Sequence, residues 1–210
     1  MEILLLSRHT GAVAPFLAAA VGAGHGRLRL GYVDDAQRSF AQAPFVEAER
    51  AAVDGLGHDV VRITVRDTTP AELDALLASL DVLYVASGST FALLESLRTT
   101  GNAEVIVAHV RRGLPYIGAS AGSIVAGPDA TPASLLDDPA DGPLLTDLGG
   151  LGLVDQTVVP HADGQLPPYP PKLIQQTLDT YGREYELVPL RDDQALRVDD
   201  SGARVIDSGS

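Results

Sequence analysis

The sequence predicts an α/β fold, in which helices flank a doubly wound and mainly parallel sheet. Apolar runs of four to seven residues recur along the chain, and segments of helical periodicity separate them. Such runs are typical of strands that helices cover on both faces, because neither face is left to carry polar side chains. Strands that alternate with helices assemble into a parallel sheet through right-handed crossovers. A length of 210 residues suits one core, so we expect a single domain over residues 1–210.

Six apolar segments are the expected main strands. In chain order they are residues 3–6, 28–33, 60–65, 82–86, 116–119 and 157–159. Three shorter strands are expected near the C-terminus, at residues 185–190, 195–198 and 204–206. The segment Asp199-Asp200-Ser201-Gly202 is expected to turn a hairpin between the last two, because these residue types favour tight turns.

Segments of helical period predict the helices, at residues 44–56, 70–80, 90–98, 102–112 and 172–181. Thr69 is a typical N-cap, and Pro70 suits the first helical position. Gly101 separates two of the helices. Two irregular stretches interrupt the pattern, residues 127–150 and the proline-rich residues 161–171. We expect the first to be a surface excursion over the crevice at the carboxyl ends of the strands.

Composition and charge exclude several classes of function. The net charge is −13 and the 15 basic residues form no cluster, so we expect no nucleic-acid partner, because phosphate backbones bind clustered Lys and Arg. No apolar run is long enough to span a bilayer, and no basic segment precedes the apolar N-terminal strand. We therefore expect no membrane contact and a cytoplasmic location. The absence of cysteine excludes disulfides, thiolate zinc sites and a cysteine nucleophile.

The segment around Ser120 predicts a serine nucleophile. An apolar strand runs into Gly118-Ala119-Ser120-Ala121-Gly122, and a helix of small residues follows. This Gly-x-Ser-x-Gly order is typical of a sharp strand-to-helix turn that exposes the serine hydroxyl at the sheet edge, where glycines avoid a side-chain clash. The amide of Ala121 is then expected to point to the place where a tetrahedral oxyanion forms. The alternative interpretation is a tight structural turn that happens to contain serine.

A second strand-to-helix turn, Ser87-Gly88-Ser89, is expected to lie beside the first. It follows the apolar strand at residues 82–86, and parallel strands end at the same edge of a sheet. The amide of Gly88 is then expected to supply a second oxyanion donor. A simple loop with a Ser or Thr helix cap is an equally good interpretation of these residues.

A serine nucleophile needs a general base, and the chain offers five histidines. His161 follows the strand at residues 157–159, so its imidazole is expected at the same sheet edge as Ser120. The other four are interpreted as surface or packing residues: His9, His25, His58 and His109.

The carboxylate that orients the imidazole is harder to choose, because acidic residues are abundant. Asp192 follows the apolar segment at residues 187–190 and is favoured. The alternatives lie in the irregular stretch: Asp137, Asp138 and Asp141. The short interval between Ser120 and His161 leaves little room for the serine, acid, histidine order of an α/β-hydrolase. The interval therefore argues against an α/β-hydrolase.

Several stretches in chain order carry a resemblance to a known family. They are Leu4-Leu5-Leu6-Ser7, Val85-Ala86-Ser87-Gly88-Ser89-Thr90-Phe91, Pro115-Tyr116-Ile117-Gly118-Ala119-Ser120-Ala121-Gly122, Leu151-Gly152-Leu153 leading into Val159-Pro160-His161, and Leu190-Arg191-Asp192 before Leu196-Arg197-Val198. Together they span nearly the whole chain. The chain resembles the peptidase E family, aspartyl dipeptidases and their relatives, which are serine peptidases. That resemblance implies a flavodoxin-like, class I glutamine amidotransferase-like fold.

The resemblance also implies roles for individual residues. By it, Ser120 is the nucleophile, His161 is the general base, and the amides of Gly88 and Ala121 bind the oxyanion. The third member of the family's triad, usually glutamate, falls on Asp192, which is one methylene shorter.

The resemblance further points to residues near the substrate. The family's Gly-Gly-Gly-Asn-Thr turn reads Ala86-Ser87-Gly88-Ser89-Thr90 here, which adds the side chains of Ser87 and Ser89. The arginine that holds the substrate's aspartate in the family falls at Lys172, a point charge without a bidentate fork. A strict preference for N-terminal aspartate is therefore not expected.

These observations predict a serine peptidase that hydrolyses dipeptides or short peptides through an acyl-enzyme. We expect it to need no metal or cofactor and to act as a monomer or a homodimer. One alternative is a serine esterase or amidase with a non-peptide substrate, and another is a non-catalytic member of the fold that binds a small ligand. A glutamine amidotransferase is disfavoured, because that chemistry on this fold uses a cysteine.

Overall fold

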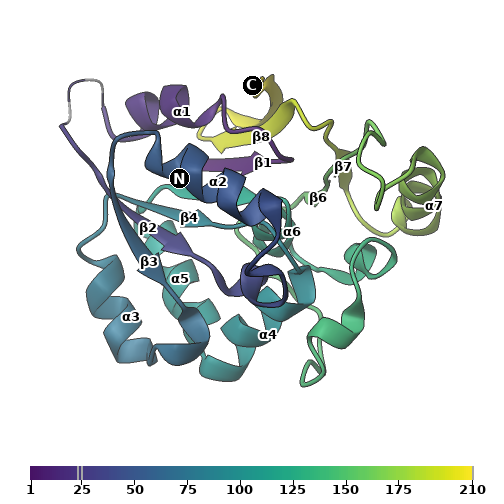
Figure 1. Cartoon of the computed structure of the whole chain (residues 1–210), viewed down its shortest axis with the longest axis horizontal. Coiled ribbons are helices and arrows are strands. Elements are labelled where there is room, and N and C mark those ends of the chain that lie inside the picture. The colour runs from purple at the N-terminus through teal and green to yellow at the C-terminus, as the bar shows by residue number, and fades with distance from the viewer. Residues whose placement is uncertain (23, 25, 210) are drawn as a thin grey trace.

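A seven-stranded sheet lies at the centre of the molecule (Figure 1). The computed structural model describes residues 1–22, 24 and 26–209. In spatial order the strands are β3 (Asp59–Ile63), β2 (Arg29–Val33), β4 (Val82–Val85), β5 (Tyr116–Ala119), β1 (Ile3–Leu6), β8 (Gln194–Asp199) and β9 (Gly202–Asp207). The first five run parallel, and β8 and β9 add an antiparallel edge beside β1. The expected mainly parallel sheet is therefore confirmed.

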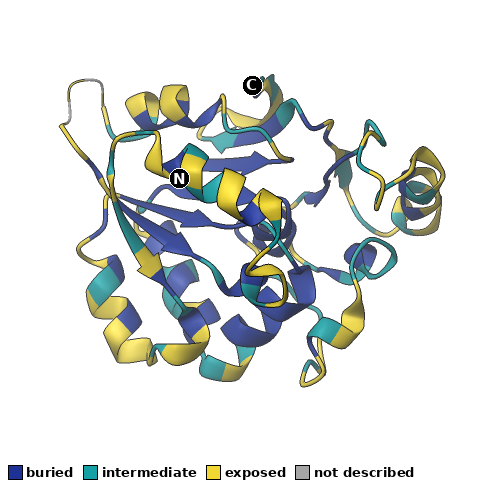
Figure 2. Ribbon diagram, in the orientation of Figure 1, coloured by how far each residue is buried: buried dark blue, intermediate teal, exposed yellow. Residues whose placement is uncertain are grey.

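Helices cover both faces of this sheet, as expected for a doubly wound fold. One face carries α1 (Val13–Ala20) and α2 (Pro44–Asp54), and the other carries α3 (Pro70–Leu77), α4 (Thr90–Thr100), α5 (Asn102–Arg111) and α6 (Ala121–Ala126). Each face buries its own apolar cluster. Figure 2 shows most of the strands as buried, with the exposed residues on the outer sides of the helices. The result is a single-domain α/β protein.

Local sequence explains where the expected helices begin and end. Helix α3 begins with a capping box, in which Thr69 and Glu72 each accept a hydrogen bond from the other's backbone amide. Gly101 ends α4 with a φ of 73°, a left-handed conformation that glycine adopts without a steric penalty. Helix α1 was not expected, because its residues are almost all apolar or alanine and lack the polar face of an amphipathic helix.

Two short strands pair in parallel outside the central sheet. They are β6 (Thr157–Val159) and β7 (Leu187–Pro189), and with α7 (Pro171–Tyr181) they lie at one end of the molecule (Figure 1). The expectation that residues 157–159 continue the central sheet is wrong, because β1 already has β5 on one side and β8 on the other. The chain therefore builds a small second sheet there.

The segment between α6 and β6 is irregular, as expected. It contains two short 3₁₀ helices, η3 (Thr131–Leu135) and η4 (Pro139–Asp141). Within the part of the chain that the structure describes, no helix is both long enough and apolar enough to cross a membrane.

Candidate active site

Ser120 sits on a strained turn between β5 and α6. Its φ of 45° and ψ of −102° are rare for a residue with a side chain, and such a conformation costs about 1–3 kcal/mol. The Ser120 amide donates a hydrogen bond to the Leu6 carbonyl at 3.0 Å. A Cβ atom at Gly122 would overlap the Val85 carbonyl, so the turn approaches β4 too closely for any other residue at that position. This geometry is that of the predicted nucleophile turn.

Buried hydrogen bonds hold this turn in place. The Ser123 hydroxyl lies within hydrogen-bonding distance of the Leu6 carbonyl at 2.7 Å and of the Gly118 carbonyl at 2.9 Å. The Tyr116 hydroxyl donates to the Gly122 carbonyl at 2.7 Å. Because Ser123 and Tyr116 are fully buried, these bonds fix the turn from within the core.

Ser120, His161 and Asp192 form a continuous hydrogen-bonded chain. Ser120 Oγ lies 3.3 Å from His161 Nε2, and His161 Nδ1 lies 2.7 Å from Asp192 Oδ1. An ionised Asp192 can only accept, so Nδ1 carries the proton and Nε2 is free to accept from the serine hydroxyl. All three side chains are buried. The structure therefore brings the three expected residues together in the expected order.

Short connections after β6 and β7 position the histidine and the aspartate. The Leu190 amide donates to the Val159 carbonyl and the Ala162 amide to the Leu190 carbonyl, both at 2.9 Å. These two bonds extend the pairing of β6 with β7 as far as His161. The His161 amide then donates to the Ser7 hydroxyl at 2.8 Å. Ser7 directly follows β1, so this bond ties the small sheet to the large one.

Arg8 binds the second oxygen of Asp192. Its guanidinium donates to Asp192 Oδ2 at 2.9 Å, while half of the arginine side chain remains exposed. Burial raises the pKa of Asp192, but the hydrogen bonds from His161 and Arg8 outweigh it and hold this pKa below its ordinary value. Asp192 is therefore ionised at neutral pH, which keeps the imidazole oriented.

Two backbone amides beside Ser120 are free to donate. Within the described residues, neither the Gly88 amide nor the Ala121 amide has a hydrogen-bond partner. Ala121 is the first residue of α6, where amides lack an acceptor inside the helix. Gly88 and Ser120 line the same cavity. The two turns therefore end side by side, as expected from the parallel pairing of β4 and β5.

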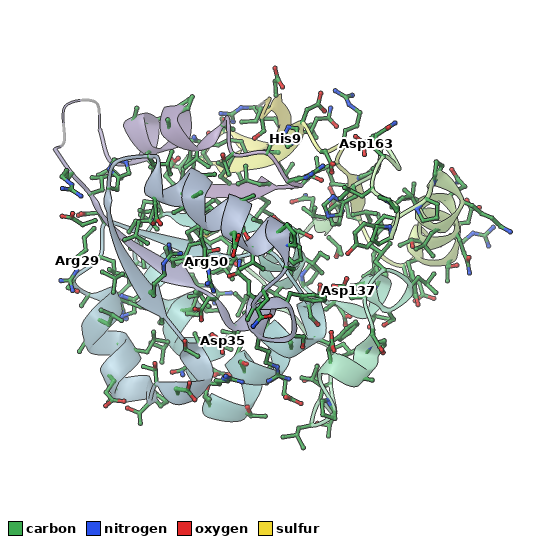
Figure 3. All side chains as sticks on the ribbon, in the orientation of Figure 1. His9, Arg29, Asp35, Arg50, Asp137 and Asp163 are labelled. Atoms are coloured by element: carbon green, nitrogen blue, oxygen red, sulfur yellow. The ribbon has the colours of Figure 1, made fainter. Side chains whose placement is uncertain are left out.

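A cavity of about 650 Å³ opens at these turns. This volume lies within the usual range for small-molecule sites, which is about 300–1,000 Å³. Its wall includes apolar side chains from η1 (Asp35–Phe40), α2 and the proline-rich stretch, namely Phe40, Phe45, Ala48, Ala52, Leu166, Pro168 and Tyr169. It also includes Asp137, Asp138 and Asp141, and Figure 3 labels Asp137 on the segment between α6 and β6. The irregular segment therefore covers the site.

Of the three side chains expected near the substrate, two line the cavity and one does not. The Ser87 hydroxyl donates to Glu49 at 2.6 Å, and the Ser89 hydroxyl accepts from the Ala92 amide as the N-cap of α4. Both serines line the cavity, but their hydroxyls are engaged within the protein. Lys172 is exposed near the start of α7 and does not line the cavity. The expectation that Lys172 lies near the substrate is therefore wrong, because α7 turns that residue toward solvent.

None of the other described histidine side chains belongs to the hydrogen-bonded chain, although the His9 amide donates to the Asp192 carbonyl at 3.1 Å. His9 lines the cavity, His58 accepts from the Leu28 amide at 3.4 Å, and His109 is 2.8 Å from Asp74. His25 lies outside the described residues. In the described part of the chain, no three side chains of His, Cys, Asp or Glu are grouped so as to hold a metal ion.

Sequence reasoning missed one aromatic neighbour of the imidazole. Tyr169 stacks on His161, with ring centroids 4.7 Å apart and planes 15° from parallel. Its hydroxyl donates to Asp137 at 3.4 Å. Burial raises the pKa of Asp137, although hydrogen bonds from Thr90 and Tyr169 oppose it. A tyrosine inside a proline-rich stretch was the available signal, since such stretches next to a site often supply pocket walls.

Comparison with known sequences identifies related proteins. The chain matches the model of Peptidase family S51 over residues 7–206. An uncharacterized peptidase of Pasteurella multocida is 34% identical over 168 residues, which cover 80% of this chain and 73% of the relative. Peptidase E of Citrobacter koseri is 34% identical over 174 residues, which cover 80% of this chain and 71% of the relative.

Solved structures share the fold. The crystal structure of a candidate peptidase E from Listeria monocytogenes has a TM-score of 0.84 at 24% identity, with 98% of both chains covered. A peptidase from an acI-B1 actinobacterium has a TM-score of 0.71 at 18% identity, with coverage of 98% of this chain and 87% of that one. The match to the family model and the sequence identities show that the chain belongs to peptidase family S51, a family of serine-type peptidases.

Proposed function

We propose that this protein hydrolyses dipeptides or short peptides through an acyl-enzyme formed on Ser120. His161 takes the proton of the serine hydroxyl as Oγ bonds to the carbonyl carbon of the scissile amide. The same imidazole then gives that proton to the leaving amine as the carbon–nitrogen bond breaks. A water molecule then attacks the ester carbonyl carbon as His161 takes its proton. The bond between that carbon and Ser120 Oγ breaks, His161 returns the proton to Oγ, and the carboxylic acid leaves.

Two other groups of residues assist in this mechanism. Asp192 holds the imidazole in the productive tautomer and stabilises the imidazolium that forms during each step. The amides of Gly88 and Ala121 donate to the oxyanion of each tetrahedral intermediate. The observation that carries the proposal is the unbroken path from Ser120 Oγ through His161 to Asp192, at 3.3 Å and 2.7 Å.

The charge of the cavity supports a preference for neutral residues over aspartate. Arg8 is the single Lys or Arg among the described residues that line it, and its guanidinium already pairs with Asp192. Acidic side chains from α2 and the irregular segment line the same cavity: Glu49, Asp137, Asp138 and Asp141. Burial raises the pKa of Glu49 and of Asp137. A substrate carboxylate would find no free cation in this acidic wall, whereas a free α-amine would be attracted to its carboxylates.

A panel of dipeptides tests this proposal. We expect dipeptides with an N-terminal leucine or phenylalanine to be cleaved faster than those with aspartate, as measured by release of free amino acids. Ser120→Ala should lose turnover and keep its thermal melting transition. Faster cleavage of the aspartyl dipeptides would refute the specificity. Turnover of short acyl esters with no peptide cleavage would instead identify an esterase.

A further inference from the structure

Glu49 is an acidic residue whose carboxylate is surrounded by hydrogen-bond donors from other elements. It lies on α2, and its carboxylate reaches the turn that follows β4. Oε1 accepts from the Ser87 amide at 3.1 Å and from the Tyr84 hydroxyl at 3.0 Å. Oε2 accepts from the Ser87 hydroxyl at 2.6 Å and from Gln37 Nε2 at 2.8 Å. Both oxygens are therefore occupied by donors.

A further layer of contacts fixes these donors. Gln37 Nε2 also donates to the Tyr32 hydroxyl at 2.7 Å, and its Oε1 accepts from Arg50 at 3.1 Å. Figure 3 labels Arg50 on α2. The rings of Tyr32 and Tyr84 stack with centroids 5.3 Å apart. Only one orientation of the Gln37 side-chain amide lets its oxygen accept from Arg50 and its nitrogen donate to Tyr32. In that orientation the nitrogen also donates to Glu49.

Burial raises the pKa of Glu49, and the hydrogen bonds from Ser87, Tyr84 and Gln37 oppose that rise. The arrangement of these donors suits an ionised carboxylate at position 49. In a protonated glutamic acid or a glutamine, one of the two carboxylate oxygens is replaced by an O–H or NH₂ group. The hydrogen of that group would then face a neighbouring donor. The Ser87 amide cannot turn away, and it lies 3.1 Å from one oxygen and 3.3 Å from the other. Whichever way a glutamine side chain were placed, its NH₂ group would approach that amide. The partly buried Ser87 amide would then lose its acceptor, which would loosen its hold on the turn.

The residue that Glu49 holds is directly joined to a proposed oxyanion donor. Gly88 follows Ser87 and has a φ of 137°. On the other side of the turn, the Ser89 amide donates to the Ala36 carbonyl at 2.9 Å. A Cβ atom at Gly88 would overlap that same carbonyl. The peptide unit that carries the Gly88 amide is therefore held between Glu49 on one side and η1 on the other.

We propose that Glu49 is a positioning residue, which holds Ser87 so that the Gly88 amide faces the oxygen of the carbonyl group whose carbon Ser120 attacks. The inference rests on the proposed function, because an oxyanion donor matters only if Ser120 is a nucleophile. Its carboxylate is not available to bind substrate directly, since donors from the protein occupy both oxygens. Its effect is therefore expected on the reaction step and not on substrate binding.

The rate at which a fluorophosphonate probe labels Ser120 tests this role. Attack of Ser120 Oγ on phosphorus expels fluoride, and the phosphonyl oxygen then occupies the oxyanion position. We expect Glu49→Gln to lower this rate by about 10- to 100-fold, somewhat less than the loss of a whole oxyanion donor. On the best dipeptide of the panel, kcat should fall while KM changes little.

Glu47→Gln is the matched control, because Glu47 is exposed on the same helix and its carboxylate makes no hydrogen bond or ion pair within the described residues. It removes the same charge from α2 and should label at the wild-type rate. A folded Glu49→Gln variant that also labels at the wild-type rate would overturn the inference. An unlabelled wild-type protein would instead refute the proposed function, so the two failures are distinguishable.

Ser87→Ala provides a second test that does not depend on the folding of the first variant. It removes the hydroxyl that donates to Glu49 and keeps the amide, so we expect a smaller fall in the labelling rate, by several-fold. If Glu49 acts through Ser87, the variant with both Glu49→Gln and Ser87→Ala should show a smaller fall in labelling rate than the product of the two single falls. Fully multiplicative effects, or a wild-type rate for Ser87→Ala, would contradict the proposed path.

Discussion

The two halves of the candidate site are built in different ways. Ser120 and the amides of Gly88 and Ala121 lie at the ends of β4 and β5, inside the central sheet. His161 and Asp192 follow β6 and β7, which form a small separate sheet at one end of the molecule (Figure 1). Core packing fixes the first half. A few hydrogen bonds that join distant parts of the chain fix the second.

Because of this difference, we expect substitutions in the two halves to affect different properties of the protein. On the serine side, strain in the turn is held by buried contacts with β1 and β4, so a change there should cost stability first. On the histidine side, the groups are held by Ser7, Arg8 and Tyr169. Changes there should affect activity and leave the fold nearly intact.

Replacing Asp192 with asparagine should have the largest effect on activity. The amide can donate to His161 Nδ1, which would favour the tautomer with its proton on Nε2 and leave no base facing Ser120. We expect kcat/KM to fall by roughly 10⁴-fold, as is typical for loss of the orienting carboxylate. Activity close to that of the wild type would show that another acid completes the site, and Asp137→Asn would then be the variant to measure.

Replacing Ser123 with alanine tests the half of the site that contains Ser120. The variant loses a buried hydroxyl that lies within hydrogen-bonding distance of the Leu6 and Gly118 carbonyls. We expect the free energy of unfolding to fall by about 1 kcal/mol in urea titrations. The kcat of the folded variant should stay near that of the wild type. A large fall in kcat without loss of stability would reverse the comparison between the two halves.

Removing the ring that stacks on His161 should have a smaller effect on activity than Asp192→Asn. Tyr169→Ala would free the imidazole to leave the orientation in which it meets Ser120, and we expect kcat to fall by about 10-fold. Tyr169→Phe is the control, because it keeps the stacked ring and loses only the 3.4 Å contact with Asp137. If the phenylalanine variant were as impaired as the alanine variant, the hydroxyl and not the stacking would be responsible.

Arg8→Gln should have the smallest effect of these changes. It should lower the free energy of unfolding slightly, by an amount that depends on pH. Asp192 has a lowered pKa in the folded protein, so its interactions stabilise the fold above its ordinary pKa and lose that effect as pH falls through the lowered value. Because half of Arg8 is exposed, we expect it to contribute less than about 1 kcal/mol at neutral pH. Acid titrations of unfolding should show wild type and variant converging at low pH. A gap that widened toward low pH would contradict this assignment.

The turn that carries Ser120 could be predicted from the sequence, whereas the contacts that hold His161 and Asp192 in place could not. The turn at Ser120 has a local signature, because its conformation requires small residues at fixed spacing. The contacts of His161 with Ser7 and of Asp192 with Arg8 join residues 154 and 184 positions apart. No local pattern encodes such pairs, since tertiary packing alone brings them together. For the same reason no local pattern in the sequence points to Glu49.

Strand assignment shows the same limit. The apolar segments of the central sheet were found within a few residues of their observed bounds, because burial on both faces imposes a strong pattern. The sheet to which residues 157–159 belong was predicted wrongly. Strand pairing depends on which edges are free in the folded molecule, and periodicity does not contain that information.

The mass of the intact protein after treatment with a fluorophosphonate probe is the most direct test of the central claim. We expect a single adduct, which peptide mapping places on Ser120 and which is absent from Ser120→Ala. His161→Ala should form it far more slowly. An unmodified wild-type protein, or an adduct on another residue, would contradict the claim that this buried serine is an activated nucleophile.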